Sequence, residues 1–297
     1  MKLFKSLFLS SMLMTFLSGC SSLPVLDPKG PVGEAQKDLI FWSIALMLII
    51  VAVVFALFTF IVVKYRERPG QDSDEPILVD DHNKWLEITW TGIPVIIVIL
   101  LAVPTVKTIY ELEEPPQSSE DKEPLVIHAT SADWKWFFSY PEQGIETVNY
   151  LHIPEDRPIQ FKLVSADSMA ALWIPRLGGQ EYNMSGMMTQ LYLQADETGV
   201  YNGRNANFNG EGFAEMQFKV YAQTEEEFGD WVEDVQTEAP KLTQDEYDHL
   251  LVPGHTEVQE FSNTHLDYVN HAQQADYVLE AWERVGYDPE EDESSSH

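Results

Sequence analysis

The stretch GRNANFNGEGFAEM, residues 203–216, has the layout of a metal-binding loop but almost none of the side chains that bind metal. Its asparagines alternate with other residues among glycines, and an aromatic residue and a methionine follow at fixed spacing. These positions are Asn205, Asn207, Asn209, Phe213 and Met216. The chain therefore keeps the frame of such a loop without its ligands, and the rest of the sequence must explain why.

The charge of the chain is distributed unevenly along its length. The 297 residues carry a formal net charge of -30, and 44% of them are apolar, enough to form a sizeable core. From Glu111 onward there are 9 Lys and Arg against 38 Asp and Glu, whereas the earlier residues hold 9 against 10. The acidic part is expected to face water and to repel nucleic acid. Nucleic acid is therefore excluded as a partner.

Residues 1–19 have the features of a secretory signal peptide. Lys2 and Lys5 precede an apolar run, which ends in small residues before Cys20. The segment LSGC resembles a bacterial lipobox, and this resemblance implies cleavage before Cys20 and acylation of its thiol. The alternative is an ordinary signal in which the cysteine has no role. Cys20 is the only cysteine, so no disulfide can form within one chain.

Residues 20–110 are predicted to form a transmembrane hairpin. The first span, residues 39–63, contains no charge and exceeds the roughly 20 residues that cross a bilayer. The second span, residues 86–109, is interrupted by Pro94 and Pro104, which membrane helices tolerate when neighbouring groups compensate. Basic residues in the intervening loop place it in the cytoplasm. Both ends of the chain are then expected on the outer face of the cell membrane.

The remainder is predicted to be a β domain followed by helices. A linker, residues 111–124, leads to residues 125–222, where short apolar segments alternate with turns. These segments are LVIHAT, WKWFFSYP, IQFKLVSA, MTQLYLQA and AEMQFKVYA. Their length and spacing indicate a β-sandwich or barrel of cupredoxin size. Residues 223–286 show helical spacing, with a predicted capping box at Thr224 and Glu227. Residues 287–297 are predicted to be a disordered acidic tail.

This organisation resembles subunit II of the haem-copper respiratory oxidases over nearly the whole chain. In the cytochrome c oxidases of that family, the loop reads Gly-x-Cys-x-Glu-x-Cys-Gly-x-x-His-x-x-Met and holds a dinuclear copper centre with an earlier His. Here Asn205, Asn207 and Asn209 stand at the Cys, Glu and Cys positions, Phe213 at the His and Ala170 at the earlier His. Only Met216 matches a ligand. One thioether cannot assemble a two-copper site, so we expect no metal in this chain.

Loss of these ligands is typical of the quinol oxidase branch of the family. The segments VLDPKGPV, DKEPLVIHATSADWKWFFSYPEQGIETVNYL and SADSMAALWIPRLGGQ resemble subunit II of the haem-a menaquinol oxidases of Gram-positive bacteria. The resemblance implies a membrane-anchored α+β chain within a complex that oxidises quinol, reduces dioxygen to water and pumps protons. It places the haems and the remaining copper in subunit I. This chain would then be a non-catalytic partner of subunit I and smaller subunits, without a cofactor and without cytochrome c.

Glu87 is the residue most strongly implicated in chemistry. The segment WLEITWT resembles the family segment whose glutamate lies at the cytoplasmic mouth of a proton path into subunit I. An acid at a membrane boundary is costly enough to suggest a use. The alternative is a solvated glutamate at a helix start, favoured there by the helix dipole.

Other side chains are expected to be structural. Trp134 and Trp136 match the aromatic pair of the family, but without a copper acceptor we expect them to pack in the core. Met184, Met187 and Met188 lack accompanying His or Cys and are predicted to serve contact or packing. Six of the eight histidines lie in the region after the linker and before the tail, and they show no shared ligand spacing: His128, His152, His249, His255, His265 and His271.

A second function remains open on the sequence alone. The chain could be a lipid-anchored, cupredoxin-like binding or scaffold protein that works without an oxidase. Its spans would then be anchors only, whereas the oxidase hypothesis requires them to pack on a large partner and to carry a proton-path acid. A cytochrome c oxidase subunit is excluded by the number of ligands.

Overall fold

A computed structural model describes residues 23–66, 83–116, 119 and 122–289. The predicted signal peptide 1–19, its lipidation site Cys20, most of the loop between the spans and residues 290–297 of the predicted tail lie outside the described residues. The described chain divides into two units. One contains the β domain together with the segment up to Glu34, and the other is residues 35–111.

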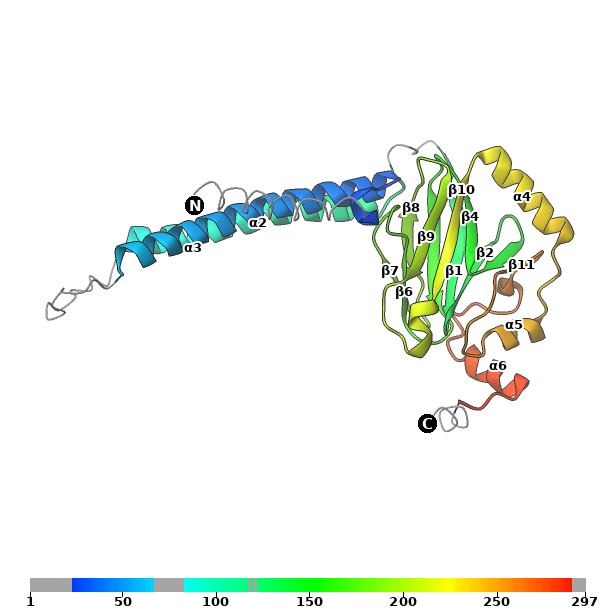
Figure 1. Cartoon of the computed structure of the whole chain (residues 1–297). Helices are drawn as coiled ribbons and strands as arrows, with labels where there is room; N and C mark the ends of the chain where they lie inside the picture. The colour runs from blue at the N-terminus through cyan, green and yellow to red at the C-terminus, as the bar shows by residue number, and fades with distance from the viewer. Residues whose placement is uncertain (1–22, 67–82, 117–118, 120–121, 290–297) are drawn as a thin grey trace, which may run out of the picture. The chain divides into compact units, whose positions relative to one another are not determined.

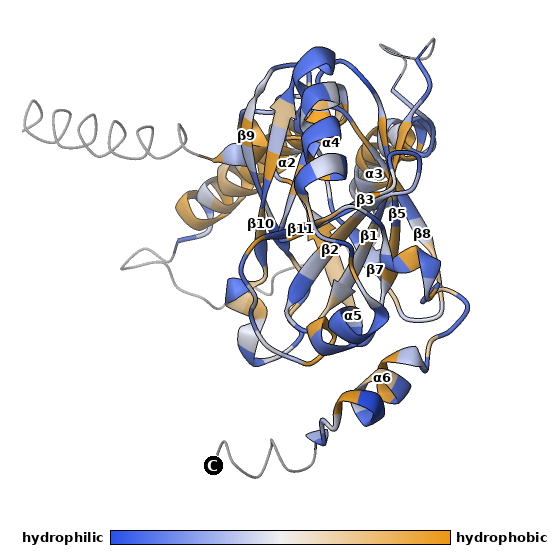
Figure 2. Cartoon of the chain, turned by 90° about the vertical axis from the view of Figure 1, so that its right-hand side faces the viewer, coloured by the Kyte–Doolittle hydropathy of each residue, from blue (hydrophilic) through white to orange (hydrophobic). Residues whose placement is uncertain are grey.

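The two predicted spans lie within two long helices, α2 (Pro31–Lys64) and α3 (Lys84–Leu112) (Figure 1). Each is longer than its predicted span. Apolar residues dominate the visible length of both helices (Figure 2). Most of their large apolar side chains are exposed. Such a surface is stable only in lipid or against other apolar helices. The hairpin is therefore membrane-anchored, as predicted.

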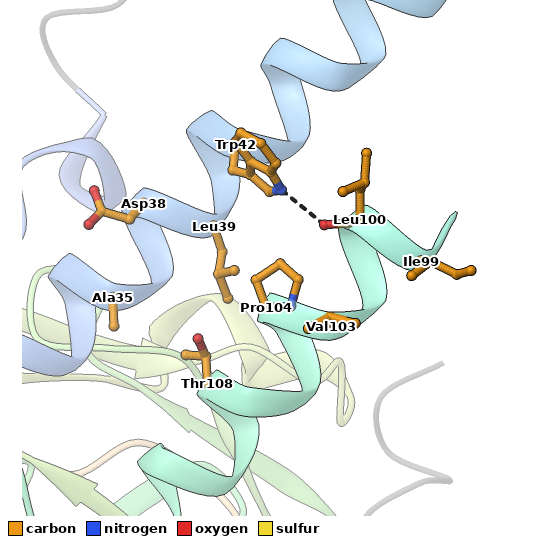
Figure 3. A pocket seen from close by; sticks show the side chains of 9 residues that line it. All are labelled: Ala35, Asp38, Leu39, Trp42, Ile99, Leu100, Val103, Pro104 and Thr108. Carbon is orange, nitrogen blue, oxygen red and sulfur yellow. Dashed lines mark hydrogen bonds between the residues drawn. The ribbon is translucent and has the colours of Figure 1, made fainter. Parts of the chain in front are cut away.

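A proline inside α3 is compensated by the neighbouring helix. Pro104 has no N–H, so the carbonyl oxygen of Leu100, four residues earlier, loses its helical partner. The indole Nε1 of Trp42 in α2 donates to that oxygen at 3.1 Å (Figure 3). Beside this bond lies a hollow of about 630 Å³ between the helices, with Asp38 and Thr108 among its lining residues. The bond satisfies a backbone group that lipid could not.

Replacing Trp42 with Phe is expected to weaken the hairpin by about 1 kcal/mol, the usual scale for a hydrogen bond between membrane helices. The loss should nearly vanish in a Pro104→Ala background, because the introduced alanine restores the backbone N–H that bonds the Leu100 oxygen. Helix association would be followed by cross-linking of cysteine pairs between α2 and α3 in micelles. Equal losses in both backgrounds would contradict the role of this bond.

The β domain consists of two facing sheets (Figure 1). The first has the order β11-β3-β2-β1-β5-β8, with β1 (Leu125–Ala132), β2 (Lys135–Tyr140), β3 (Ile145–Val148), β5 (Ile159–Ser165), β8 (Thr189–Leu193) and β11 (Gln259–Phe261). The second has the order β4-β10-β9-β6-β7, with β4 (Tyr150–Pro154), β6 (Ala170–Trp173), β7 (Glu181–Asn183), β9 (Gly199–Asn205) and β10 (Gln217–Gln223). The pairs β1/β5 and β4/β10 are parallel and the others antiparallel.

Aromatic side chains from both sheets form the core. The ring centroid of Phe218 in β10 lies 5.5 Å from that of Trp136 and 5.0 Å from that of Phe138, both in β2. Trp136 and Phe138 are fully buried. The prediction of a cupredoxin-like β-sandwich is therefore confirmed, and the core role expected for Trp136 is confirmed with it.

The segment before α2 belongs to the β domain rather than to the hairpin. It begins with the short helix η1 (Pro24–Leu26). The backbone N–H of Lys29 donates to the oxygen of Arg176 at 2.7 Å, and the N–H of Asp196 donates to the oxygen of Lys29 at 2.9 Å. Val32 is buried in the main core cluster. The predicted hairpin domain of residues 20–110 is thus divided, since its first described part packs on the sandwich.

The C-terminal extension contains α4 (Glu225–Glu238), α5 (Gln244–Leu250) and α6 (Tyr277–Val285). Its predicted capping box is present, because the Thr224 side chain accepts from the backbone N–H of Glu227 and the Glu227 side chain accepts from that of Thr224. The extension is not wholly helical. The strand β11 joins the edge of the first sheet at β3. The helical spacing of residues 271–286 gives a regular helix only from Tyr277.

Candidate functional site

Three connections of the β domain converge around the asparagine loop. The loop links the neighbouring strands β9 and β10, and it contains the short helix η3 (Glu211–Glu215). Asn209 of this loop bonds to the turn between β1 and β2 through Asp133 and to the β5–β6 connection through Ser168. The structure therefore brings the predicted frame positions together with residues up to 76 positions away in the chain.

Asn205 is the centre of the network that fills the frame. Its side chain is only 2% exposed. Its Oδ1 accepts from the backbone N–H groups of Ala171 and Asn207, each at 2.9 Å. Its Nδ2 donates to Oδ1 of Asn209 at 2.9 Å. An amide can accept and donate at once, which a copper-binding thiolate cannot do. Asn205 thus ties the loop to β6 by hydrogen bonds.

The other two asparagines extend this network. Nδ2 of Asn209 donates to Oδ1 of Asp133 at 3.2 Å and to Oγ of Ser168 at 3.1 Å, and it lies 3.7 Å from the sulfur of Met216. Nδ2 of Asn207 donates to the backbone oxygen of Met169 at 2.8 Å. The amide groups are engaged with protein partners, so the loop is held as a hydrogen-bonded unit.

The remaining frame positions are filled by packing. Ala170 and Met216 are buried, and the ring of Phe213 lies 5.5 Å from that of Phe208. Trp134 closes the loop from outside, because its Nε1 donates to the oxygen of Asn209 at 3.0 Å. Its ring lies so close to Gly212 that an added Cβ would be 2.4 Å from it. Trp134 is half-buried and packs against the edge of the main core cluster, whereas the sequence predicts it within the core. The glycine is required by the close approach of the Trp134 ring.

These residues do not fit a dinuclear copper centre. The donor set of Asn205, Asn207 and Asn209 is neutral amide, whereas copper prefers thiolate and imidazole. Phe213 and Ala170 supply no ligand atom. Within the described parts of the chain, no three His, Cys, Asp or Glu side chains are placed to hold a metal ion. The geometry therefore supports a structural role for the loop.

Asn205→Ala is expected to destabilise the β domain by about 2 kcal/mol, because it leaves two buried N–H groups without their acceptor. Asn207→Ala should cost less than about 0.5 kcal/mol, since its side chain makes one exposed bond. Urea unfolding of the full chain in detergent, followed by tryptophan fluorescence, would compare the two. Equal losses would show that Asn205 is not the centre of the network.

A cluster of titratable residues that the sequence did not indicate lies beside the loop: Lys135 is buried, and Asp133 and Asp167 are half-buried. Asp167 accepts from the backbone N–H of Asp133 at 2.9 Å, and Asp133 accepts from the Ser168 hydroxyl. Burial and, less strongly, the Asp133 carboxylate raise the pKa of Asp167 to about 7. Burial lowers the pKa of Lys135 to about 8. Lys135 Nζ donates to the carbonyl oxygens of Asp133, Val252 and Gly254 at 3.1, 2.7 and 2.8 Å.

Asp167 should make the β domain less stable as the pH rises from about 4 to about 7. In this window the folded state holds a proton that the unfolded state has released, so unfolding is favoured at higher pH. We expect Asp167→Asn to remove about 2 kcal/mol of this pH-dependent loss. Urea unfolding at pH 4.5 and pH 8 would measure it. The quantity to compare is the difference in unfolding free energy between variant and wild type, because the histidine contributions cancel in it. If this difference is the same at pH 4.5 and pH 8, the assignment to Asp167 is wrong.

Glu87 lies in the other unit, in the first turn of α3. Its side chain is exposed, and its backbone N–H donates to the oxygen of Asn83 at 3.1 Å. The side chain of Asn83 also accepts from the N–H of Leu86 at 3.3 Å. Glu87 is therefore held at a capped helix start, the place that the sequence predicted.

The methionines and histidines do not form a shared site. Met184 and Met187 pair as a backbone bridge, and Met187 and Met188 are exposed. His265 and His271 are buried, with ring centroids 5.9 Å apart, and each makes its own hydrogen bonds. His152 is stacked between Tyr221 and Trp231.

Comparisons with known proteins show the family to which the chain belongs. Residues 25–108 match the family described as cytochrome c oxidase subunit II, transmembrane domain. Quinol oxidase subunit 2 of Bacillus spizizenii is 60% identical over 271 residues, covering 91% of this chain and 84% of that protein. Probable quinol oxidase subunit 2 of Staphylococcus haemolyticus is 46% identical over 288 residues, which cover 97% of this chain and 75% of that protein. The periplasmic domain of subunit II of cytochrome oxidase of Bradyrhizobium japonicum is 25% identical, covering 38% of this chain and 93% of that one, with a TM-score of 0.37. The chain belongs to the quinol oxidase subunit 2 family.

Proposed function

We propose that the chain is subunit II of a proton-pumping terminal oxidase that oxidises quinol, with menaquinol favoured by the sequence resemblance, and reduces dioxygen to water. The observation that carries this proposal is the asparagine network. It fills the frame in which a copper centre would receive electrons from a soluble donor. A complex without that electron entry must take its electrons from a donor in the membrane. The alternative of an independent scaffold protein is disfavoured by the family assignment.

The chain itself is proposed to be a non-redox subunit. The haems and the remaining copper would lie in subunit I, and quinol would be a substrate of the whole complex. The almost wholly exposed apolar surface of α2 and α3 supports packing on subunit I, smaller subunits and lipid. Acylated Cys20, which lies outside the described residues, would add a lipid anchor on the outer side.

Glu87 is proposed to collect protons at the cytoplasmic surface for a path into subunit I. Its position in the first turn of α3, at the end of a long apolar helix, supports this role, because a proton-collecting carboxylate must lie where the helix leaves the membrane. The Lys64–Lys84 connection is proposed to be cytoplasmic and the β domain extracytoplasmic. This topology places Glu87 on the side from which a pump takes up protons.

Purification of the tagged chain from its native membrane tests the proposal. We expect a haem-containing large subunit to co-purify, with oxygen uptake driven by a menaquinol analogue and no oxidation of reduced cytochrome c. Metal analysis should account only for the copper of subunit I. A chain that purifies alone, without haem or oxidase activity, would support the scaffold alternative instead.

A further inference from the structure

The outer face of the second sheet carries a groove that the oxidase function does not use. Two adjoining hollows, of about 410 and 420 Å³, lie between strands β4 and β10 and the segment 255–260 that leads into β11. Lys219 and Val258 line both hollows, so the two adjoin, and together we call them the groove. The groove lies entirely within the unit that contains the β domain. Two adjoining hollows suit a ligand that extends from one into the other.

One half of the groove has a rigid aromatic wall. The ring of His152 lies 4.3 Å from Trp231 and 4.7 Å from Tyr221, stacked with both, and Tyr150 meets it edge-on at 5.7 Å. Nδ1 of His152 is held by Oε1 of Gln223 at 2.6 Å. Because stacking and this bond fix the rings before any ligand arrives, binding on them costs little conformational entropy. The wall is preorganised.

The rest of the lining is rich in amides and nearly balanced in charge. Asn202, Gln217 and Gln259 line the hollows, and each already makes one hydrogen bond within the protein. Oδ1 of Asn202 accepts from Lys219, Nε2 of Gln217 donates to the oxygen of Ala214 at 2.7 Å, and Nε2 of Gln259 donates to Oγ1 of Thr256 at 3.0 Å. Each amide keeps further donor and acceptor capacity, because it has two N–H groups and an oxygen with two lone pairs. The Lys, Asp and Glu residues of the lining are Lys219, Glu257 and Glu260, and the Glu260 carboxylate already accepts from the Tyr150 hydroxyl. This composition contrasts with the region from Glu111 onward as a whole, which carries 9 basic and 38 acidic residues. A strongly charged ligand finds no matching charge here.

We propose that this groove binds a neutral, linear oligosaccharide on the outer side of the membrane. A sugar hydroxyl both donates and accepts, and a side-chain amide can meet it with its NH2 donor and its separate oxygen acceptor, as at Asn202, Gln217 and Gln259. The C–H face of a sugar ring packs on an aromatic face such as that of Tyr221. β10 is already paired on both sides, with β4 and β9, so an extended peptide could add only at the edge strand β4.

The binding test uses the full chain in a detergent without a sugar headgroup, since a maltoside would compete for the groove. Chitotetraose and cellotetraose are the probes, followed by calorimetry and by the fluorescence of tryptophans, which include the stacked Trp231. We expect a dissociation constant below about 1 mM for at least one of them. No binding of either sugar at roughly 10 mM would overturn the proposal, as would binding of an unstructured peptide in their place.

Variants locate the site. Tyr221→Ala should weaken binding about tenfold by removing the aromatic face, and Tyr221→Phe should retain most of the affinity. Gln217→Ala, an exposed change that leaves the core intact, should weaken it about threefold and keeps the test decisive if Tyr221→Ala misfolds. Tyr182→Ala is the matched control, because Tyr182 is an exposed tyrosine of β7 outside the groove. Equal losses in Tyr182→Ala and Tyr221→Ala would overturn the assignment.

Discussion

Replacing Glu87 with Ala is expected to lower quinol-driven oxygen uptake about tenfold, which is less than the roughly 10²–10⁴-fold that a positioned acid or base contributes in a transition state. The substitution removes a carboxylate that would collect protons at the cytoplasmic surface. The complex should still assemble with an unchanged haem spectrum, because the Glu87 side chain is exposed and contributes little packing within this chain. Turnover per haem, measured across pH, is the decisive quantity.

Conservative and matched variants separate proton delivery from a structural effect. Glu87→Asp should retain more activity than Glu87→Ala, because it keeps a carboxylic acid at the same position. Glu111→Ala should leave turnover unchanged; this acid lies near the opposite end of α3, in an exposed pair with Lys107 at 3.3 Å. Asn205→Ala and Asn207→Ala should also have little effect on turnover in the assembled complex. Unimpaired oxygen uptake in Glu87→Ala would make Glu87 a solvated helix-start residue.

Sequence patterns were sufficient where the signal is local. The five apolar segments predicted as strands correspond to β1, β2, β5, β8 and β10. The capping box at Thr224 was predicted because its partner Glu227 is only three residues away. Both spans were predicted from length and hydropathy alone. In each case the residues that determine the element lie within that element or directly beside it.

Long-range partners were not predictable from a single sequence. The asparagine frame was recognisable, but its partners Asp133 and Ser168 lie 76 and 41 residues from Asn209. The Asp167 and Lys135 cluster had no motif at all, since its chemistry comes from burial in the folded state. The short strands β6, β7 and β11 have three or four residues each, too few for a recognisable alternation.

Tertiary contacts also explain why the last predicted helix begins late. Residues 271–276 have helical spacing, but the His271 ring is buried and lies 2.7 Å from the Tyr247 hydroxyl. The side chain of Asn270 accepts from the backbone N–H of Ala272, which favours a turn over a helix. Burial of a polar ring against α5 therefore outweighs local helical preference, and the regular helix starts only at Tyr277.

The largest loss of stability is expected from Glu146→Ala, at about 3–5 kcal/mol, the scale for breaking a buried pair. Glu146 and His265 are fully or almost fully buried. One carboxylate oxygen of Glu146 accepts from His265 Nδ1 at 2.7 Å, from the His265 backbone N–H at 3.0 Å and from the Ser139 hydroxyl at 2.7 Å. Removing the carboxylate leaves three buried donors without their acceptor and removes one attachment of the C-terminal extension to the first sheet, leaving the β11–β3 pairing.

An exposed pair in the same extension provides the control. Asp245 and His249 lie 3.8 Å apart with side chains 88% and 61% exposed, so Asp245→Ala should cost less than about 0.5 kcal/mol. Glu146→Gln should lose less than Glu146→Ala, because its amide oxygen can still accept some of the three bonds. Urea unfolding of the full chain in detergent measures the stability, and limited proteolysis shows whether the extension is released first. If Glu146→Ala and Asp245→Ala cost the same, the buried pair does not anchor the extension, and the contacts of β11 and α4 with the sandwich must hold it alone.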